Sequence, residues 1–151
     1  MKSTNSIQKD IISNFQTLDD DFEMILNYLI ELGEKLDEFD VEEKKDDNLI
    51  KGCQSKVWLS YKIIDNKLFF SGDSNTSITK GLLSLLIKVF SNQTAEEIIK
   101  TKLFFINERF WIFKKSNNLF RQNFPLIILF SISLLLFIIF DAFSFPHFLK
   151  I

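Results

Sequence analysis

The chain has 151 residues, a formal net charge of -2 and one cysteine. This length suits a single domain with a buried core, and one cysteine excludes an internal disulfide and a thiol-based metal cluster. The charge is uneven: residues 10–47 carry 14 acidic and three basic side chains, whereas residues 48–151 carry 13 basic and six acidic ones. A nucleic-acid binder would need a positive balance with interleaved aromatics, so no nucleic acid is expected as a partner. The start lacks the apolar stretch of a secretory signal, and a reducing cytoplasm is the expected location.

The first third of the chain is expected to be helical. Apolar residues recur at helical spacing and predict one or two helices between residues 6 and 36, broken near the acidic run Leu18–Asp21. The segment Asp37–Asn48 holds few apolar residues and suits a loop. The simplest interpretation of all this acidity is a solvated surface.

The period then changes to that of strands. Apolar and polar residues alternate over residues 57–63, and Asp65-Asn66 suits a tight hairpin turn into a second strand over residues 67–72. The segment "GDSNTS" after it is expected to interrupt regular structure. A small antiparallel sheet is therefore predicted in the middle of the chain.

Two further helices are predicted after the hairpin. Residues 78–90 form an amphipathic pattern, and Gly81 within it indicates a close backbone contact. Thr94 and Glu97 have the spacing of a capping box for a short helix that ends near Lys102. Helices flanking a small antiparallel sheet give an α+β fold class.

The single cysteine, Cys53, lies in the sequence "IKGCQSKVWL" (residues 50–59). A lone cysteine is usually a small core residue. Here Gly52 precedes it and Gln54-Ser55 follow, which describes a turn. Two neighbouring lysines, Lys51 and Lys56, favour the thiolate.

The chain has no plausible general base near this thiol. Its one histidine, His147, lies in a separate C-terminal stretch, so a protease-like nucleophile is poorly supported. A thiolate that attacks the outer sulfur of a persulfide needs only access and a suitable pKa. The pattern favours a sulfur carrier over a hydrolase.

Three stretches together resemble the SufE family, whose members accept sulfur from cysteine desulfurases. The stretch "IKGCQSKVWL" resembles the family's active-site signature. "GDSNTSITKGLLSLLIKVF" (residues 72–90) and "YLIELGEKLDEFD" (residues 28–40) resemble its other two blocks. The resemblance covers roughly residues 10–106, so residues 1–106 are expected to be the SufE-like domain.

The resemblance implies an α+β domain of the SufE/IscU kind. It implies that Cys53 takes persulfide sulfur from a desulfurase, stimulates that enzyme and passes the sulfur to iron–sulfur cluster assembly. The pyridoxal phosphate would belong to the desulfurase, so this chain would need no cofactor. A homodimer stays open.

The motif residues suggest individual roles. Gly52 lets the backbone turn sharply, whereas Gln54 and Ser55 could hydrogen-bond a persulfide or the partner, or merely complete a turn. Lys51 is the remaining residue of the loop around Cys53 that is expected to bind the partner. Trp58 is expected to anchor the loop to the core, with contact to the partner as the alternative.

The second block suggests further roles. Asp73 matches the family's "GDS", as a partner-binding loop residue or as a cap for the helix that follows. Asn75 stands where the family often has a second aspartate. Lys80 and Gly81 match the family's "KG", with Gly81 expected to serve packing.

Residues 107–151 do not fit the family pattern. No charged residue occurs in the apolar run 122–140, which is long enough for a membrane span, with the basic residues Lys114, Lys115 and Arg121 before it. A membrane anchor, a docked hydrophobic helix and a reading-frame slip near residue 107 all remain open.

The sequence leaves one alternative function, a non-catalytic binding module. In that case Cys53 is a structural residue and the acidic helical region recruits the partner.

Overall fold

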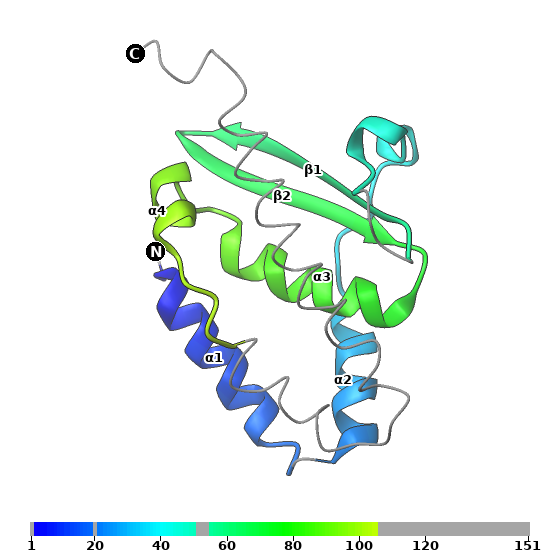
Figure 1. Cartoon of the computed structure of the whole chain (residues 1–151), viewed down its shortest axis with the longest axis vertical. Coiled ribbons are helices and arrows are strands. Elements are labelled where there is room, and N and C mark those ends of the chain that lie inside the picture. The colour runs from blue at the N-terminus through cyan, green and yellow to red at the C-terminus, as the bar shows by residue number, and fades with distance from the viewer. Residues whose placement is uncertain (1, 20, 51–54, 106–151) are drawn as a thin grey trace.

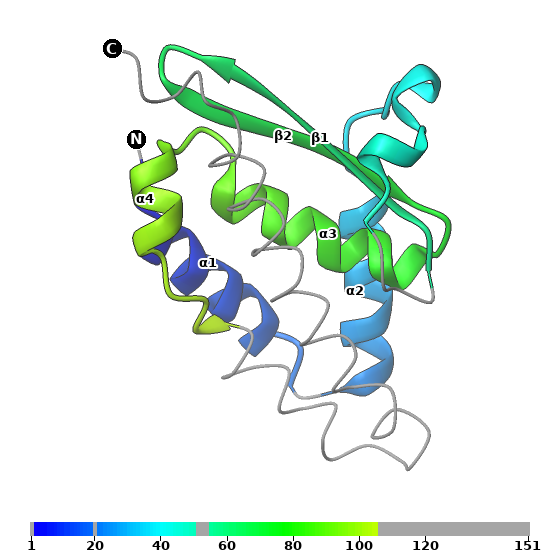
Figure 2. The ribbon, with the colours of Figure 1, turned by 45° about the horizontal axis from the view of Figure 1, so that its top comes forward.

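The computed structural model describes residues 2–19, 21–50 and 55–105. Figure 1 shows a β-hairpin with the α-helices beneath it, and Figure 2 shows that these α-helices lie on one side of the hairpin. This arrangement confirms the predicted α+β class. In chain order the elements are α1 (Thr4–Gln16), α2 (Phe22–Glu34), the 3-10 turns η1 (Val41–Glu43) and η2 (Asp46–Asn48), β1 (Val57–Ile64), β2 (Lys67–Ser74), α3 (Ser77–Phe90) and α4 (Ala95–Lys100).

The start of each N-terminal helix follows from its capping residue. The Ser3 side chain accepts the Ser6 N–H before α1. Asp21 begins α2, and its carboxylate accepts the N–H groups of Glu23 and Met24 at 2.9 and 3.1 Å. Since these N–H groups have no partner inside the helix, the caps define where each helix starts. The predicted break between the two helices is thus confirmed.

The hairpin has the turn that its sequence predicts. Asp65 and Asn66 have φ values of 50° and 61°, which a two-residue hairpin turn requires and which these residue types tolerate. The register pairs Ile64 with Lys67 at the turn and Val57 with Ser74 at the open end. The second strand therefore continues through the "GDS" stretch, which the sequence had suggested as an interruption.

The hydrophobic core lies between the hairpin and the helices. Helix α3 lies along β2 and against α2, and it contributes Leu83 and Val89, which are fully buried. Val57 and Leu68 supply the core face of the hairpin, with exposed fractions of 0% and 1%. At the C-terminal end, Thr94 and Glu97 form the predicted capping box of α4. Because α3 begins only three residues after β2 ends, the open end of the hairpin lies next to the first turn of α3.

The predicted tail, residues 107–151, lies outside the described residues, as does its apolar run 122–140. Within residues 2–19, 21–50 and 55–105, no helix has the length and apolar character that crossing a membrane requires.

Candidate functional site: the base of the cysteine loop

The predicted site falls at the open end of the hairpin. Four of its residues lie outside the described residues: Lys51, Gly52, Cys53 and Gln54. The structure describes the residues on either side, Ile50 and Ser55, and also the predicted site residue Asp73. The site can therefore be built from the contacts that hold its two ends.

The chain before the cysteine is held against β1. The Ile50 N–H donates to the Val57 carbonyl oxygen at 2.8 Å, and Leu49 forms a bridge with Trp58. The Ile50 side chain is 3% exposed and belongs to the core. Hydrogen bonding and burial together fix Ile50, the last described residue before the cysteine.

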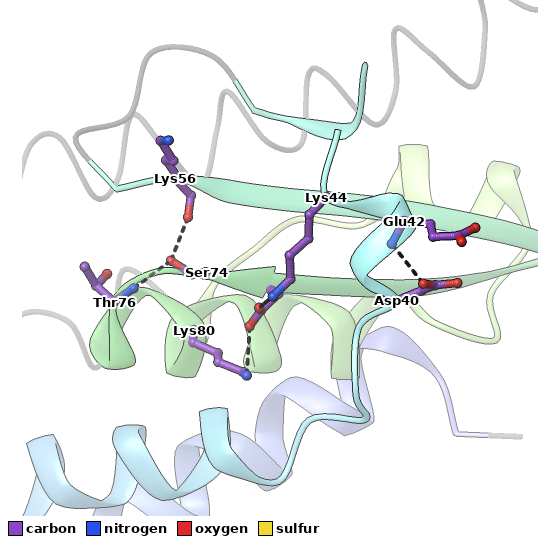
Figure 3. Close-up of polar contacts among 8 residues, drawn as sticks. Asp40, Glu42, Lys44, Lys56, Ser74, Thr76 and Lys80 are labelled. Atoms are coloured by element: carbon purple, nitrogen blue, oxygen red, sulfur yellow. Dashed lines mark hydrogen bonds and ion pairs between the residues drawn. The ribbon is translucent and has the colours of Figure 1, made fainter. Parts of the chain in front are cut away.

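The chain after the cysteine is held against the residues that connect β2 to α3. The Lys56 N–H donates to Asn75 Oδ1 at 2.8 Å, and the Lys56 carbonyl accepts the Asn75 N–H at 3.1 Å. The same carbonyl accepts from Ser74 Oγ at 3.1 Å, and Ser74 Oγ also lies 3.4 Å from the Thr76 nitrogen, as Figure 3 shows. Asn75 thus pairs with the backbone of Lys56 in both directions, accepting with its side-chain oxygen and donating with its backbone N–H.

Three hydroxyl groups meet beside Ser55. Ser55 Oγ lies 3.0 Å from Thr76 Oγ1 and 3.2 Å from Thr79 Oγ1, and the two threonine oxygens are 2.8 Å apart. We call this set of Ser55, Thr76 and Thr79 the hydroxyl ring. The prediction that Ser55 contacts a persulfide or a partner stays a prediction, since here its hydroxyl contacts α3.

Asp73 lies between two lysines. Its Oδ2 is 2.7 Å from Lys44 Nζ and its Oδ1 is 2.8 Å from Lys80 Nζ, and its side chain is only 13% exposed. Figure 3 shows Lys44 and Lys80 reaching toward each other from the segment before η2 and from α3. Burial raises the pKa of the Asp73 carboxyl. The hydrogen bonds from Lys44, Lys80 and the Ser74 backbone, together with the charge of Lys80, lower it by more in sum, so this pKa lies below its ordinary value.

Two predicted roles are wrong. Asp73 does not cap the following helix: it lies in β2 opposite Trp58, and the N-cap of α3 is Thr76. Trp58 does not join the core, because it alternates with the buried residues Val57 and Leu59 and so faces the other side of the hairpin. There Lys44 Nζ lies 5.8 Å from the centre of its ring, within cation–π range.

Sequence reasoning missed three residues of this region: Lys44, Thr76 and Thr79. The spacing of the two threonines around a helix start was a usable signal, since residues three apart share one helix face. Lys44 gave no signal, because it meets Asp73 only when the acidic segment Asp37–Asn48 folds over the hairpin.

The described part of the chain offers no metal site of ordinary composition. Within it, no three His, Cys, Asp or Glu side chains are grouped so as to hold a metal ion. The described residues of the site offer hydrogen bonds and charge through hydroxyls, the Asn75 side chain, the Asp73 carboxylate and lysines.

Comparison with known proteins assigns the sequence to a family. Residues 9–114 match the family model of SufE, described as the Fe-S metabolism associated domain. The match runs past residue 106, where the sequence resemblance was expected to end. Over 92 residues the chain is 39% identical to the cysteine desulfuration protein SufE of Wigglesworthia glossinidia brevipalpis.

The chain spans about three fifths of the length of that relative, since the aligned part is 60% of this chain and 62% of the relative. The family model covers well over half of the chain. With its α+β fold and its single cysteine in the signature just before β1, the chain belongs to the SufE family.

Proposed function

We propose that this protein is a sulfur acceptor that takes persulfide sulfur from a cysteine desulfurase onto Cys53. It then passes the sulfur to the machinery that assembles iron–sulfur clusters, and its binding stimulates the desulfurase. The observation that carries the proposal is family membership together with the signature "GCQSKVW" at residues 52–58. The pyridoxal phosphate would remain on the desulfurase.

The geometry of the loop base supports this proposal. Ile50 is fixed by β1 and the core, whereas Ser55 and Lys56 are fixed by the start of α3 and the residues before it. Two residues of chain reach at most about 7 Å, so covalent geometry keeps residue 53 within that distance of the Ser55 Cα. The thiol would therefore act near the first turn of α3, at one end of the domain.

The proposed transfer is a thiol–persulfide exchange. The Cys53 thiolate attacks the outer sulfur of the partner's cysteine persulfide. A new S–S bond forms on Cys53 while the S–S bond of the donor breaks, and the donor cysteine leaves as a thiolate. No net oxidation occurs and no general base is needed, because the attacking and leaving groups are both thiolates.

Intact-mass analysis tests the proposal. The protein is incubated with a cysteine desulfurase and cysteine, and its intact mass is then measured with and without a reducing agent. We expect an adduct of one sulfur atom that the reducing agent removes. Cys53→Ser, which leaves the chain without a thiol, should show no adduct.

A displaced thiol provides the matched control. Ser71 is an exposed residue of β2 on the same hairpin, so Ser71→Cys in the Cys53→Ser background presents a thiol elsewhere on that hairpin. We expect little transfer to this variant. Equal loading of the displaced thiol, or an adduct on Cys53→Ser, would refute the role of Cys53. Absence of any adduct would favour the binding-module alternative.

A further inference from the structure

The hydroxyl ring uses every proton that its members hold. Each hydroxyl has one proton, and Thr76 Oγ1 donates to Thr79 Oγ1 while Thr79 Oγ1 donates to Ser55 Oγ. Since the Thr76 proton is already used, the 3.0 Å contact between Ser55 and Thr76 has Ser55 as its donor. The result is a closed ring of three hydrogen bonds that joins the chain just after the cysteine to α3.

The ring replaces a cap that α3 would otherwise have. Thr76 occupies the N-cap position, where threonine normally accepts a backbone N–H of the first turn, but its side chain makes no such hydrogen bond. Its hydroxyl contacts Thr79 and Ser55 instead. The Thr76 hydroxyl thus contacts two other hydroxyls and no backbone N–H of the first turn, which indicates that linking Ser55 to α3 is a main role of this hydroxyl.

The ring is also the described side-chain contact nearest to Cys53 on its C-terminal side. The Lys56–Asn75 pair holds a position one residue further away. We propose that Ser55, Thr76 and Thr79 are positioning residues for the Cys53 thiol during sulfur transfer. This inference rests on the proposed function, and it assigns to the ring the task of restricting the chain before the partner arrives.

The proposal predicts two effects of opposite sign when the ring is broken. When the ring is broken, Ser55 is tied less tightly to the start of α3, so a small reagent should reach the Cys53 thiol more easily. The desulfurase must then order this part of the chain on docking, which weakens productive binding. Alkylation should become faster, while the acceptor concentration that gives half-maximal transfer rises and the maximal rate stays the same.

Thr79→Val removes one hydroxyl while keeping the shape of the side chain. We expect alkylation of Cys53 by iodoacetamide to accelerate roughly two- to fivefold, the size of effect that one modest hydrogen bond produces. The half-maximal acceptor concentration should rise by a similar factor. Ser55→Ala breaks the ring at the member that lies outside α3 and should change both values in the same way. If Thr79→Val does not fold, Ser55→Ala serves as the test. Thr79→Ser keeps the hydroxyl and should restore both values.

Ser60→Ala is the matched control. It breaks a hydroxyl pair on the hairpin, away from the ring, Ser60 with Ser71 at 2.9 Å, and it should change neither value. The positioning role is overturned if Thr79→Val and Ser55→Ala behave like wild type, or if alkylation and transfer change in the same direction. The alkylation measurement needs no desulfurase. Failure of the sulfur-acceptor proposal would therefore show as a missing sulfur adduct on the wild-type protein. Failure of the ring proposal would show as unchanged alkylation in the ring variants.

Discussion

Gly81 of α3 lies directly against the backbone of Leu29 in α2. A Cβ atom added to Gly81 would lie 2.7 Å from the Leu29 carbonyl carbon and would also meet its oxygen, and a Cβ on Gly33 would lie 2.8 Å from the Gly81 nitrogen. These neighbours are backbone atoms, which cannot move aside as a flexible side chain can. The two helices therefore approach as closely as they do because both contact positions are glycine.

Gly81→Ala is expected to destabilise the protein, although alanine forms helices better than glycine. Alanine gains about 1 kcal/mol in helix propensity, but overpacking forces the two backbones apart and outweighs this gain. We expect a net loss of about 1–3 kcal/mol in the free energy of unfolding, measured by urea denaturation. Lys88→Ala, at an exposed position of the same helix, should change it by less than about 0.5 kcal/mol. A Gly81→Ala variant as stable as wild type would contradict the close contact.

Asp73→Asn is expected to release the acidic segment from the hairpin. The carboxylate joins Lys44 and Lys80, and an amide cannot accept from both as strongly. We expect a loss of about 1–3 kcal/mol in the free energy of unfolding, because bonds to a charged and largely buried acceptor are lost. The variants Lys44→Met and Lys80→Met complete a double-mutant cycle with Asp73→Asn. If either lysine change has the same effect in the Asp73→Asn background as in wild type, the corresponding ion pair makes no contribution.

The same carboxylate gives a pH dependence with a defined sign. The pKa of Asp73 in the folded protein is lower than its ordinary value of 3.8, so the unfolded chain takes up a proton first as the pH falls. The stabilisation is therefore fully present above pH 3.8 and is lost as the pH falls through the lower, folded-state pKa. Urea denaturation at a series of pH values should show the difference between wild type and Asp73→Asn shrinking below pH 3.8. A difference that grows on acidification would reverse the assignment.

Local signals in the sequence predicted the elements well. The φ values at Asp65 and Asn66 and the capping box at Thr94 and Glu97 depend on a few adjacent residues. The glycine at position 81 indicated a close backbone contact but not its partner, Leu29. Such features are encoded by residue type and short spacing, which a sequence displays directly. The fold class followed from them.

Contacts between distant residues were not predictable in this way. Asp73 was expected to be a cap, because an aspartate shortly before a helix usually is one. The hairpin register places it opposite Trp58, and the folding of the acidic segment then brings Lys44 to it. The hydroxyl ring likewise needs Ser55 to meet the start of α3. Both arrangements depend on tertiary structure that no local pattern specifies.

Gln8 is a further residue whose importance only the structure reveals. It is fully buried in α1, and its side chain holds the last described residues of the chain. Its Oε1 accepts the N–H groups of Phe104 and Phe105 at 2.9 and 3.3 Å, and its Nε2 donates to the Lys102 carbonyl at 3.0 Å. This one amide therefore satisfies three backbone groups.

Gln8→Met tests this role, because methionine has a similar length and no hydrogen-bonding amide. The variant leaves up to three backbone groups unsatisfied in a buried place, so we expect a loss of at least about 2 kcal/mol in the free energy of unfolding. Hydrogen exchange at the Phe104 and Phe105 amides should accelerate more than exchange in α3, since the loss is local. Gln16→Met makes the same change at an exposed position of α1 and should have little effect on either measurement. Unchanged protection of Phe104 and Phe105 in Gln8→Met would show that α1 does not hold this segment through Gln8.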